Sequence, residues 1–267
     1  MKKIIVLLVS IFSYGCSLNE DNIEGEYAQY INSNSIASEI QFMPEETYAN
    51  YSVAQNPSLR LKLITKEIFP CINYSIGTSE FINGAELIIR FEKIVNPGAC
   101  ATAIGPATKY VDLPQNINKL ILINGKSIDK YDITIDSQKV KINLIESHFT
   151  TSLYDNTFRY PENSFAYICG TNTTNTNIYT DFLNILLANA SLKEISFQGE
   201  GRIPYPISSS GHWVNHKTRF FKYNTFSDFE SLGQTLTNYK NGNITPNGGV
   251  TIALKSWNNS NHFSWMN

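Results

Sequence analysis

The sequence predicts a mixed fold in which a β-sandwich is followed by an α+β domain. Between Leu59 and Ser152, short β-rich segments recur about every ten residues, and none of them shows helical spacing. After Leu153, strand-like and helix-like segments alternate, which is typical of an α+β domain. Apolar residues make up 42% of the 267 residues, so the chain can bury a sizeable core.

The region 59–152 is assigned to the β-sandwich. Leu59–Ile64 alternates apolar and polar residues as a half-buried strand does, and Asn124-Gly125 is a strong hairpin signal. Further strands are expected at Ile72–Ile76, Glu86–Val95, Lys119–Ile123, Tyr131–Ile135 and Val140–Ile145. Strands at this spacing resemble an immunoglobulin-like sandwich, although the buried Trp of antibody domains is absent. The small-residue-rich stretch 96–108 is either a functional loop or a crossover between sheets.

The region 153–267 is assigned to the α+β domain and contains two successive β-α-β patterns. The first comprises Phe165–Cys169, a helix at Ile178–Ala190, and Glu194–Phe197. The second comprises Arg219–Tyr223, a helix at Asp228–Tyr239, and Gly249–Leu254. Ser227 and Glu230 fit a capping box at the start of the second helix, and Gly242 follows its expected end. A ferredoxin-like arrangement, with two helices on one face of a sheet, fits this order.

The N-terminal stretch predicts a secretory signal peptide over residues 1–15. Two lysines precede the apolar run Ile4–Phe12, and small residues precede Cys16. The run is shorter than the roughly 20 residues that span a membrane. Cysteine directly after the cleavage site resembles the lipobox of bacterial lipoproteins, in which this cysteine is diacylated and becomes the new N-terminus. Ser13 stands where that pattern usually has leucine, and the alternative is an ordinary signal peptide with an incidental cysteine.

Residues 16–58 are interpreted as an acidic tether. Every charged residue between Cys16 and Arg60 is acidic, which is typical of a solvated spacer. Glu20 and Asp21 also resemble the surface-export signal of Bacteroidota lipoproteins, and the two roles are compatible. Apolar residues indicate that part of the segment packs against the folded body: Ile31, Ile36, Ile40, Phe42 and Met43. The protein is expected in the cell envelope, where a lipid anchor would attach it to the outer membrane.

Three further cysteines would lie in a compartment that permits disulfides. A Cys71–Cys100 bridge would close a loop of about 30 residues and stabilise by roughly 3–4 kcal/mol in the chain-entropy model. The competing pair is Cys100–Cys169, although Cys169 lies in an apolar run where a buried free cysteine is common. No pair of these cysteines shows metal-ligand spacing, so a zinc site is not expected. No cofactor is expected either.

The stretch Gly199–Pro206 is the strongest candidate for ligand binding. Glu200, Arg202 and Tyr205 place planar polar groups beside a ring, as a carbohydrate site requires, but a rigid turn with a Glu200–Arg202 ion pair is the alternative. Trp213 is a further candidate, and exposed aromatic residues Trp257 and Trp265 could extend such a face. His212 and His216 are four residues apart but lack a nearby acid or cysteine, so surface roles are expected.

Composition and motifs favour a binding protein. The net charge of −2 argues against a nucleic-acid partner, because phosphate binding needs concentrated Lys and Arg. No catalytic signature is present, and the expected function is a non-enzymatic binding or assembly module for a protein or glycan partner. The alternative, a secreted hydrolase acting on envelope or extracellular polymers, predicts a cleft with converging acids or a Cys–His pair.

Overall fold

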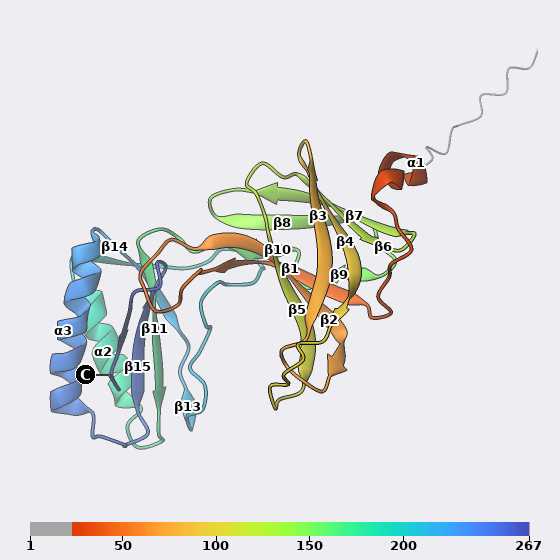
Figure 1. The fold of residues 1–267 in the computed structure, drawn as a ribbon. Helices are drawn as coiled ribbons and strands as arrows, with labels where there is room; N and C mark the ends of the chain where they lie inside the picture. Colours follow the sequence, from red (N-terminus) through yellow and green to blue (C-terminus); the bar gives the residue numbers. More distant parts are fainter. Residues whose placement is uncertain (1–22, 267) are drawn as a thin grey trace, which may run out of the picture.

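The computed structural model describes residues 23–266, and Figure 1 shows two β-sheets side by side, with two helices on the outer face of the smaller one. The expected β-rich mixed fold is therefore present. The signal peptide, Cys16, Glu20 and Asp21 lie outside the described residues. Within residues 23–266, no helix combines the length and the apolar character needed to cross a membrane.

The first sheet contains ten strands in the order β10-β8-β7-β6-β4-β3-β5-β2-β1-β9. Their bounds are β1 Ile40–Thr47, β2 Ser58–Phe69, β3 Ser75–Asn83, β4 Glu86–Val95, β5 Gly105–Asp112, β6 Lys119–Asn124, β7 Ser127–Ile135, β8 Lys139–Glu146, β9 Thr150–Ser152 and β10 Asn156–Phe158. Most pairs are antiparallel, whereas β4–β6, β3–β5 and β1–β9 are parallel.

These strands form one continuous curled sheet, so the immunoglobulin-like arrangement of two stacked sheets is not what the structure has. Long strands and irregular register explain the difference. The register between β2 and β5 shifts between Ile64 and Ile68, and that between β3 and β4 shifts at Gly77 and Thr78. Such irregularities increase local twist and bend, and the sheet therefore curls around its own core.

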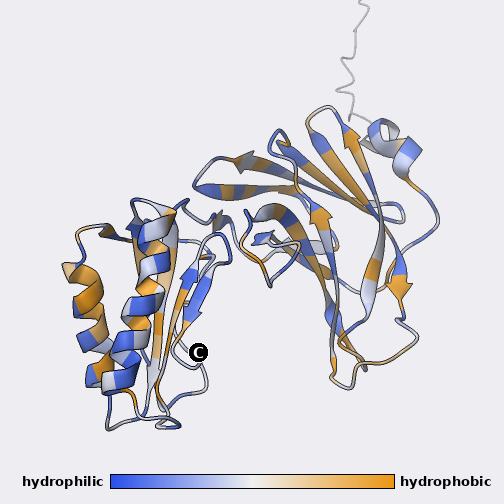
Figure 2. Cartoon of the chain, turned by 60° about the vertical axis from the view of Figure 1, so that its left-hand side comes forward, coloured by the Kyte–Doolittle hydropathy of each residue, from blue (hydrophilic) through white to orange (hydrophobic). Residues whose placement is uncertain are grey.

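Both faces of this sheet carry a cluster of buried apolar side chains, because successive residues of a strand point to opposite faces. Figure 2 shows hydrophobic and hydrophilic residues alternating along the strands. The interior core contains the buried side chains of Phe42, Leu61, Leu63, Leu87, Ile89, Phe91, Leu120 and Leu122. On the outer face, Ile88 and Ile121 pack with Tyr27, the last residue of helix α1 (Ile23–Tyr27). Successive strand residues point to opposite faces, so β4 and β6 contribute to both clusters.

Strand β1 lies within the range 16–58 that the sequence assigns to a tether. Its burial pattern shows Ile40 and Phe42 fully inside the core, and Ile36 and Met43 are also buried. β1 pairs with β2 over its whole length, from Ile40–Thr65 to Thr47–Ser58. The folded body therefore begins before residue 59, because an acidic segment still carries enough alternating apolar residues to complete a sheet.

The second sheet has the order β12-β14-β11-β15-β16, and β13 pairs with the end of β11. The bounds are β11 Ser164–Thr171, α2 Asn177–Ala188, β12 Leu192–Ile195, β13 Val214–Asn215, β14 Arg219–Tyr223, α3 Phe226–Asn243, β15 Thr251–Ser256 and β16 Asn261–Phe263. Both helices pack on one face, against Phe165 and Tyr167 of β11. The opposite face carries Ala166 and Phe220, which pack against Tyr205 from the loop between β12 and β13.

The second helix begins and ends differently from the sequence expectation. Thr225 is its N-cap, with an extended backbone, and forms the capping box with Asp228 in place of Ser227 and Glu230. The Glu230 carboxylate instead accepts a hydrogen bond from Ser260 at 3.0 Å. Gly242 lies inside α3, because the helix continues to Asn243.

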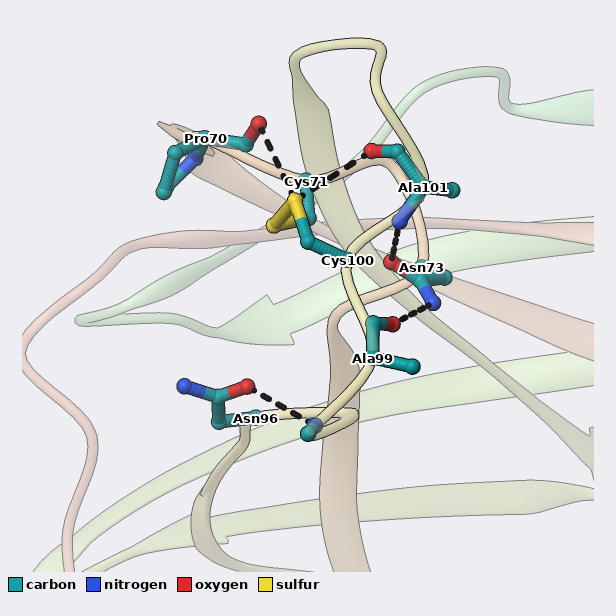
Figure 3. The surroundings of a disulfide bond; sticks show 8 residues. Pro70, Cys71, Asn73, Asn96, Ala99, Cys100 and Ala101 are labelled. Atoms are coloured by element: carbon teal, nitrogen blue, oxygen red, sulfur yellow. Dashed lines mark hydrogen bonds between the residues drawn. A yellow bond between two sulfur atoms is a disulfide. The ribbon is translucent and has the colours of Figure 1, made fainter.

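A disulfide joins Cys71, just after β2, to Cys100 in the loop before β5, with the two Cα atoms 5.4 Å apart. Figure 3 shows that the Asn73 side chain binds the same loop on either side of Cys100. It donates to the Ala99 carbonyl at 2.9 Å and accepts from the Ala101 amide at 3.1 Å. The stretch 96–108 is therefore pinned to the end of β2, and its last residues already belong to β5.

Candidate ligand-binding site

A cavity of about 690 Å³ lies where the two sheets meet, and five tyrosines contribute to its wall. The first sheet contributes the loop after β1 and the residues on either side of β10. The second sheet contributes the loop between β12 and β13 and the β15–β16 hairpin. The lining residues are Tyr48, Tyr51, Tyr154, Tyr160, Gly201, Arg202, Ile203, Pro204, Tyr205, Pro206, Ile207, Lys255, Ser256, Asn259 and Asn261.

The loop after β1 supplies the most exposed ring of the cavity. Figure 1 shows this segment (orange) reaching the second sheet. The Tyr48 hydroxyl donates to the Trp257 carbonyl at 2.6 Å, and the Asn259 side chain donates to the Val53 carbonyl at 3.0 Å. Tyr51 lies between these two contacts and is 67% exposed. The loop is held on both sides of Tyr51, which therefore presents its ring to solvent from a fixed position.

Tyr160 lies at the centre of the junction. Its backbone amide donates to Glu46 at 2.6 Å, and its hydroxyl donates to the Pro204 carbonyl at 3.0 Å. Its ring meets the Tyr205 ring edge to face, with centroids 4.8 Å apart, and lies 6.1 Å from the Tyr48 ring. Burial raises the pKa of Tyr160 to about 12 and raises the pKa of Tyr48 and Tyr205 as well. These hydroxyls therefore stay protonated at neutral pH.

Arg202 is held in place through its backbone and through its side chain. Its amide donates to the Asn156 carbonyl at 2.9 Å, and its carbonyl accepts from the Phe158 amide at 2.8 Å. Gly201 permits this approach, because it has φ +154° and a Cβ there would lie 2.9 Å from the Asn156 carbonyl oxygen. The Arg202 guanidinium forms an ion pair with Glu45 of β1. This contact attaches the loop of the second sheet to the first sheet.

The Glu200–Arg202 ion pair considered from the sequence does not form. Glu200 is exposed and is not part of the cavity lining. Arg202 turns instead toward Glu45, which also accepts a hydrogen bond from Tyr110 at 2.9 Å. Glu45 was not recognisable as a partner, because the sequence places it in a tether 157 residues away from Arg202.

The other aromatic candidates lie in different places. Tyr205 lines the cavity with its ring almost fully buried, whereas Trp213 is 86% exposed and is not part of the lining. Trp257 contributes its carbonyl to Tyr48, and Trp265 is exposed near the C-terminus. Five lining residues were not expected from the sequence: Tyr48, Tyr51, Tyr154, Tyr160 and Lys255. The four tyrosines share one local signal, because they lie just outside strand ends, whereas Lys255 lies within β15 and has no such signal.

Neither histidine of the 212–216 pair is arranged as a metal ligand. His216 binds the Thr171 hydroxyl at 2.9 Å and stacks on the Tyr179 ring, with centroids 4.5 Å apart. His212 binds the Thr251 hydroxyl at 2.9 Å. Burial lowers the pKa of His216, which favours its neutral form. Across residues 23–266, no group of three His, Cys, Asp or Glu side chains could hold a metal ion.

The Cys169 thiol and the Asp129 carboxylate are buried outside the cavity, and both have structural roles. Burial raises the pKa of the Cys169 thiol to about 11, so it is not a thiolate at neutral pH. Asp129 is fully buried and accepts hydrogen bonds from the His148 amide at 2.6 Å and from the Thr150 amide at 2.7 Å. Asp129 therefore fixes the turn between β8 and β9, and Cys169 packs in the core under the helices.

A second cavity of about 720 Å³ shares Tyr160 with the first. Its aromatic lining is already used in packing: Phe158 contacts Phe197 with centroids 5.2 Å apart, and the Trp257 indole donates to the Tyr223 hydroxyl at 2.9 Å. The first cavity differs because Tyr51 and Tyr154 leave large parts of their rings exposed. It is therefore the better candidate for binding.

The lining of the first cavity combines exposed rings with neutral and cationic polar groups, and it includes no Asp or Glu. Comparisons of the chain with protein-family models, with curated proteins and with solved structures found no match. Stacking surfaces beside amides suit a ligand with flat apolar faces and many hydroxyl groups.

Proposed function

We propose that this protein binds a glycan in the tyrosine-lined cavity and acts as a non-enzymatic binding module. The observation that carries the proposal is the pair of exposed rings, Tyr51 and Tyr154, in one cavity with Asn259 and Asn261. A sugar ring presents C–H groups on its faces and hydroxyls at its edge. Aromatic faces cover the former, and amide side chains pair with the latter.

The dimensions of the cavity support this class of ligand. Its volume of about 690 Å³ lies within the range of about 300–1,000 Å³ that is usual for small-ligand sites. The wall is preformed, since Tyr48, Tyr160 and Tyr205 are fixed by hydrogen bonds to Trp257, Pro204 and Ser164 respectively. A preformed wall reduces the conformational entropy lost on binding.

The test is binding of the purified protein to a panel of neutral and acidic oligosaccharides by calorimetry. The substitutions Tyr51→Ala and Tyr154→Ala remove exposed rings, so they should leave the fold intact and weaken binding at least about tenfold, or about 1.4 kcal/mol. Trp213→Ala is the matched control, because Trp213 is exposed and outside the cavity. Equal losses in all three variants, or no binding by the wild type, would contradict the proposal.

We also propose that the protein is attached to the outer membrane of the cell envelope through a lipid on Cys16. The signal-like residues 1–15 and the acidic residues after Cys16 support this location. A disulfide between Cys71 and Cys100 suits an oxidising compartment outside the cytoplasm. Cys16→Ala should release the protein from the membrane fraction, whereas Ser17→Ala should not. Retention of Cys16→Ala in the membrane fraction would contradict the anchor.

For the architecture, we propose that the second sheet and its helices are a ferredoxin-like unit. The support is the element order β11-α2-β12-β14-α3-β15, in which β14 pairs antiparallel with both β12 and β11. β15 pairs antiparallel with the other edge of β11. β13 and β16 are additions to this pattern. An experimental structure with another strand order would contradict the assignment.

A further inference from the structure

Lys255 places a positive charge in the cavity. Along β15, Ile252 and Leu254 belong to the core under the helices, whereas Ala253 packs on the opposite face. Lys255 shares the face of Ala253, because alternate strand residues point the same way. It lies directly across from Asn261 of β16, and both residues line the cavity. The strand pairing therefore puts an ammonium group and an amide next to each other.

The Lys255 ammonium has no partner within residues 23–266: it forms neither an ion pair with a carboxylate nor a hydrogen bond. Among the described residues, three other half-buried lysines are paired with a carboxylate, whereas Lys130 and Lys139, which lie outside this cavity, are half-buried without one. Lys62 lies 3.8 Å from Glu45, Lys109 lies 3.9 Å from Glu80, and Lys119 lies 3.2 Å from Glu86. Partial removal of an ammonium group from water is unfavourable, so such lysines are usually paired.

The positive charge of Lys255 is also not balanced by the rest of the cavity. The lining contains two cations, Lys255 and Arg202, and no acidic residue. Arg202 is already engaged in an ion pair with Glu45, whose side chain is 18% exposed and also contacts Tyr110 and Lys62. Lys255 is therefore the cation that remains available to a ligand.

We propose that the glycan bound in this cavity is acidic, and that Lys255 binds its carboxylate or sulfate group. This inference rests on the proposed function and specifies its ligand class. Tyr51 and Tyr154 contact the faces of the sugar rings, and Asn261 pairs with a neighbouring hydroxyl. The anion neutralises Lys255 at a site where the protein supplies no carboxylate, and charge-assisted hydrogen bonds of this kind are stronger than neutral ones.

The test compares sugars that differ only in charge. The carboxylate probes are oligogalacturonate, alginate and hyaluronan oligosaccharides, each with its methyl ester, and the sulfate probe is carrageenan with its desulfated form. At low salt, at least one acidic form should bind the full-length protein about tenfold or more tightly than its neutral counterpart. Loss on esterification identifies a carboxylate ligand, and loss on desulfation identifies a sulfate ligand. The preference should weaken as salt is added.

Three variants connect this preference to Lys255. Lys255→Met keeps the aliphatic stem and should abolish the preference for the acidic form, whereas Lys255→Arg should keep it. Lys141→Met is the control, because Lys141 is an exposed residue of β8 outside the cavity.

Equal binding of acidic and neutral forms, or an unchanged preference in Lys255→Met, would overturn the acidic-ligand inference and leave glycan binding standing. Absence of binding by every probe would overturn glycan binding itself, and the acidic-ligand inference with it.

Discussion

At the residue scale, two neighbouring carboxylates of β1 attach the second sheet to the first. Glu45 binds Arg202, and Glu46 binds the Arg159 side chain at 2.9 Å and the Tyr160 amide at 2.6 Å. Because successive strand residues point to opposite faces, Glu45 and Glu46 reach two different segments. The walls of the cavity depend on both contacts, since Arg202 and Tyr160 are lining residues.

Another carboxylate, Glu92 of β4, connects the N-terminal segment to the outer part of the first sheet. Hydrogen bonds from Asn34 and Ser79 lower the pKa of Glu92 from 4.5 to about 2. The ionised form is thus favoured in the folded state. Its stabilisation is complete above about pH 4.5 and is lost as the pH falls toward about 2.

The prediction is that Glu92→Gln lowers the free energy of unfolding most at neutral pH. The difference from the wild type should shrink between about pH 4.5 and about pH 2, as measured by urea unfolding at several pH values. Glu67→Gln is the control, because Glu67 is exposed and its side chain forms no ion pair among those found in residues 23–266. A pH-independent difference for Glu92→Gln would contradict the assignment.

At the element scale, the disulfide closes the stretch that contains β3 and β4. Replacing both Cys71 and Cys100 with Ser should lower the free energy of unfolding by about 3–4 kcal/mol, because the unfolded chain gains conformational entropy. A reductant should have a similar effect on the wild type and none on the double variant in urea unfolding. An unchanged midpoint in the reduced wild type would show that the bridge contributes nothing.

Two glycines with different surroundings test how the loop between β12 and β13 is attached. Gly201→Ala should destabilise by about 1–3 kcal/mol, because its φ of +154° disfavours a side chain and the added Cβ would meet the Asn156 carbonyl. Gly242→Ala should stabilise by about 0.5–1 kcal/mol, because Gly242 is helical and has open space around it. Thermal unfolding of both variants measures these shifts. Equal effects of the two substitutions would contradict the role assigned to Gly201.

At the scale of the whole molecule, the junction of the two sheets couples their stability. The Glu45 and Arg202 side chains are only 18% and 21% exposed, so their ion pair is partly desolvated. Arg202→Met should lower the free energy of unfolding by about 1–3 kcal/mol, because it leaves Glu45 partly buried with weaker neutralisation. It should also separate the calorimetric unfolding of the two sheets into distinct transitions.

The matched control for this prediction is Arg60→Met. Arg60 pairs with Asp112 at 2.9 Å, but the two side chains are 37% and 82% exposed. Exposed ion pairs contribute about 0–1 kcal/mol, so this variant should change stability little and leave the unfolding profile unchanged. If Arg202→Met behaved as Arg60→Met does, the Arg202–Glu45 contact would not couple the sheets.

The local elements of this protein follow from patterns within short stretches of its sequence. The helices α2 and α3 and strands such as β2, β4 and β6 were predictable, because their apolar periodicity is set by residues close together in the chain. The unusual glycine and proline content of Gly199–Pro206 also pointed to Arg202 and Tyr205 as candidate binding residues, and both line the cavity. The type of each element is thus encoded locally.

The assembly of these elements depends on contacts that form only in the folded chain. The single curled sheet, the role of β1 in its core, and the pairing of Arg202 with Glu45 depend on contacts between distant segments. Tyr48, Tyr154 and Lys255 meet in one cavity although long stretches of chain separate them. Sheet order and side-chain convergence arise from packing and hydrogen bonding across the whole chain, which no local pattern records.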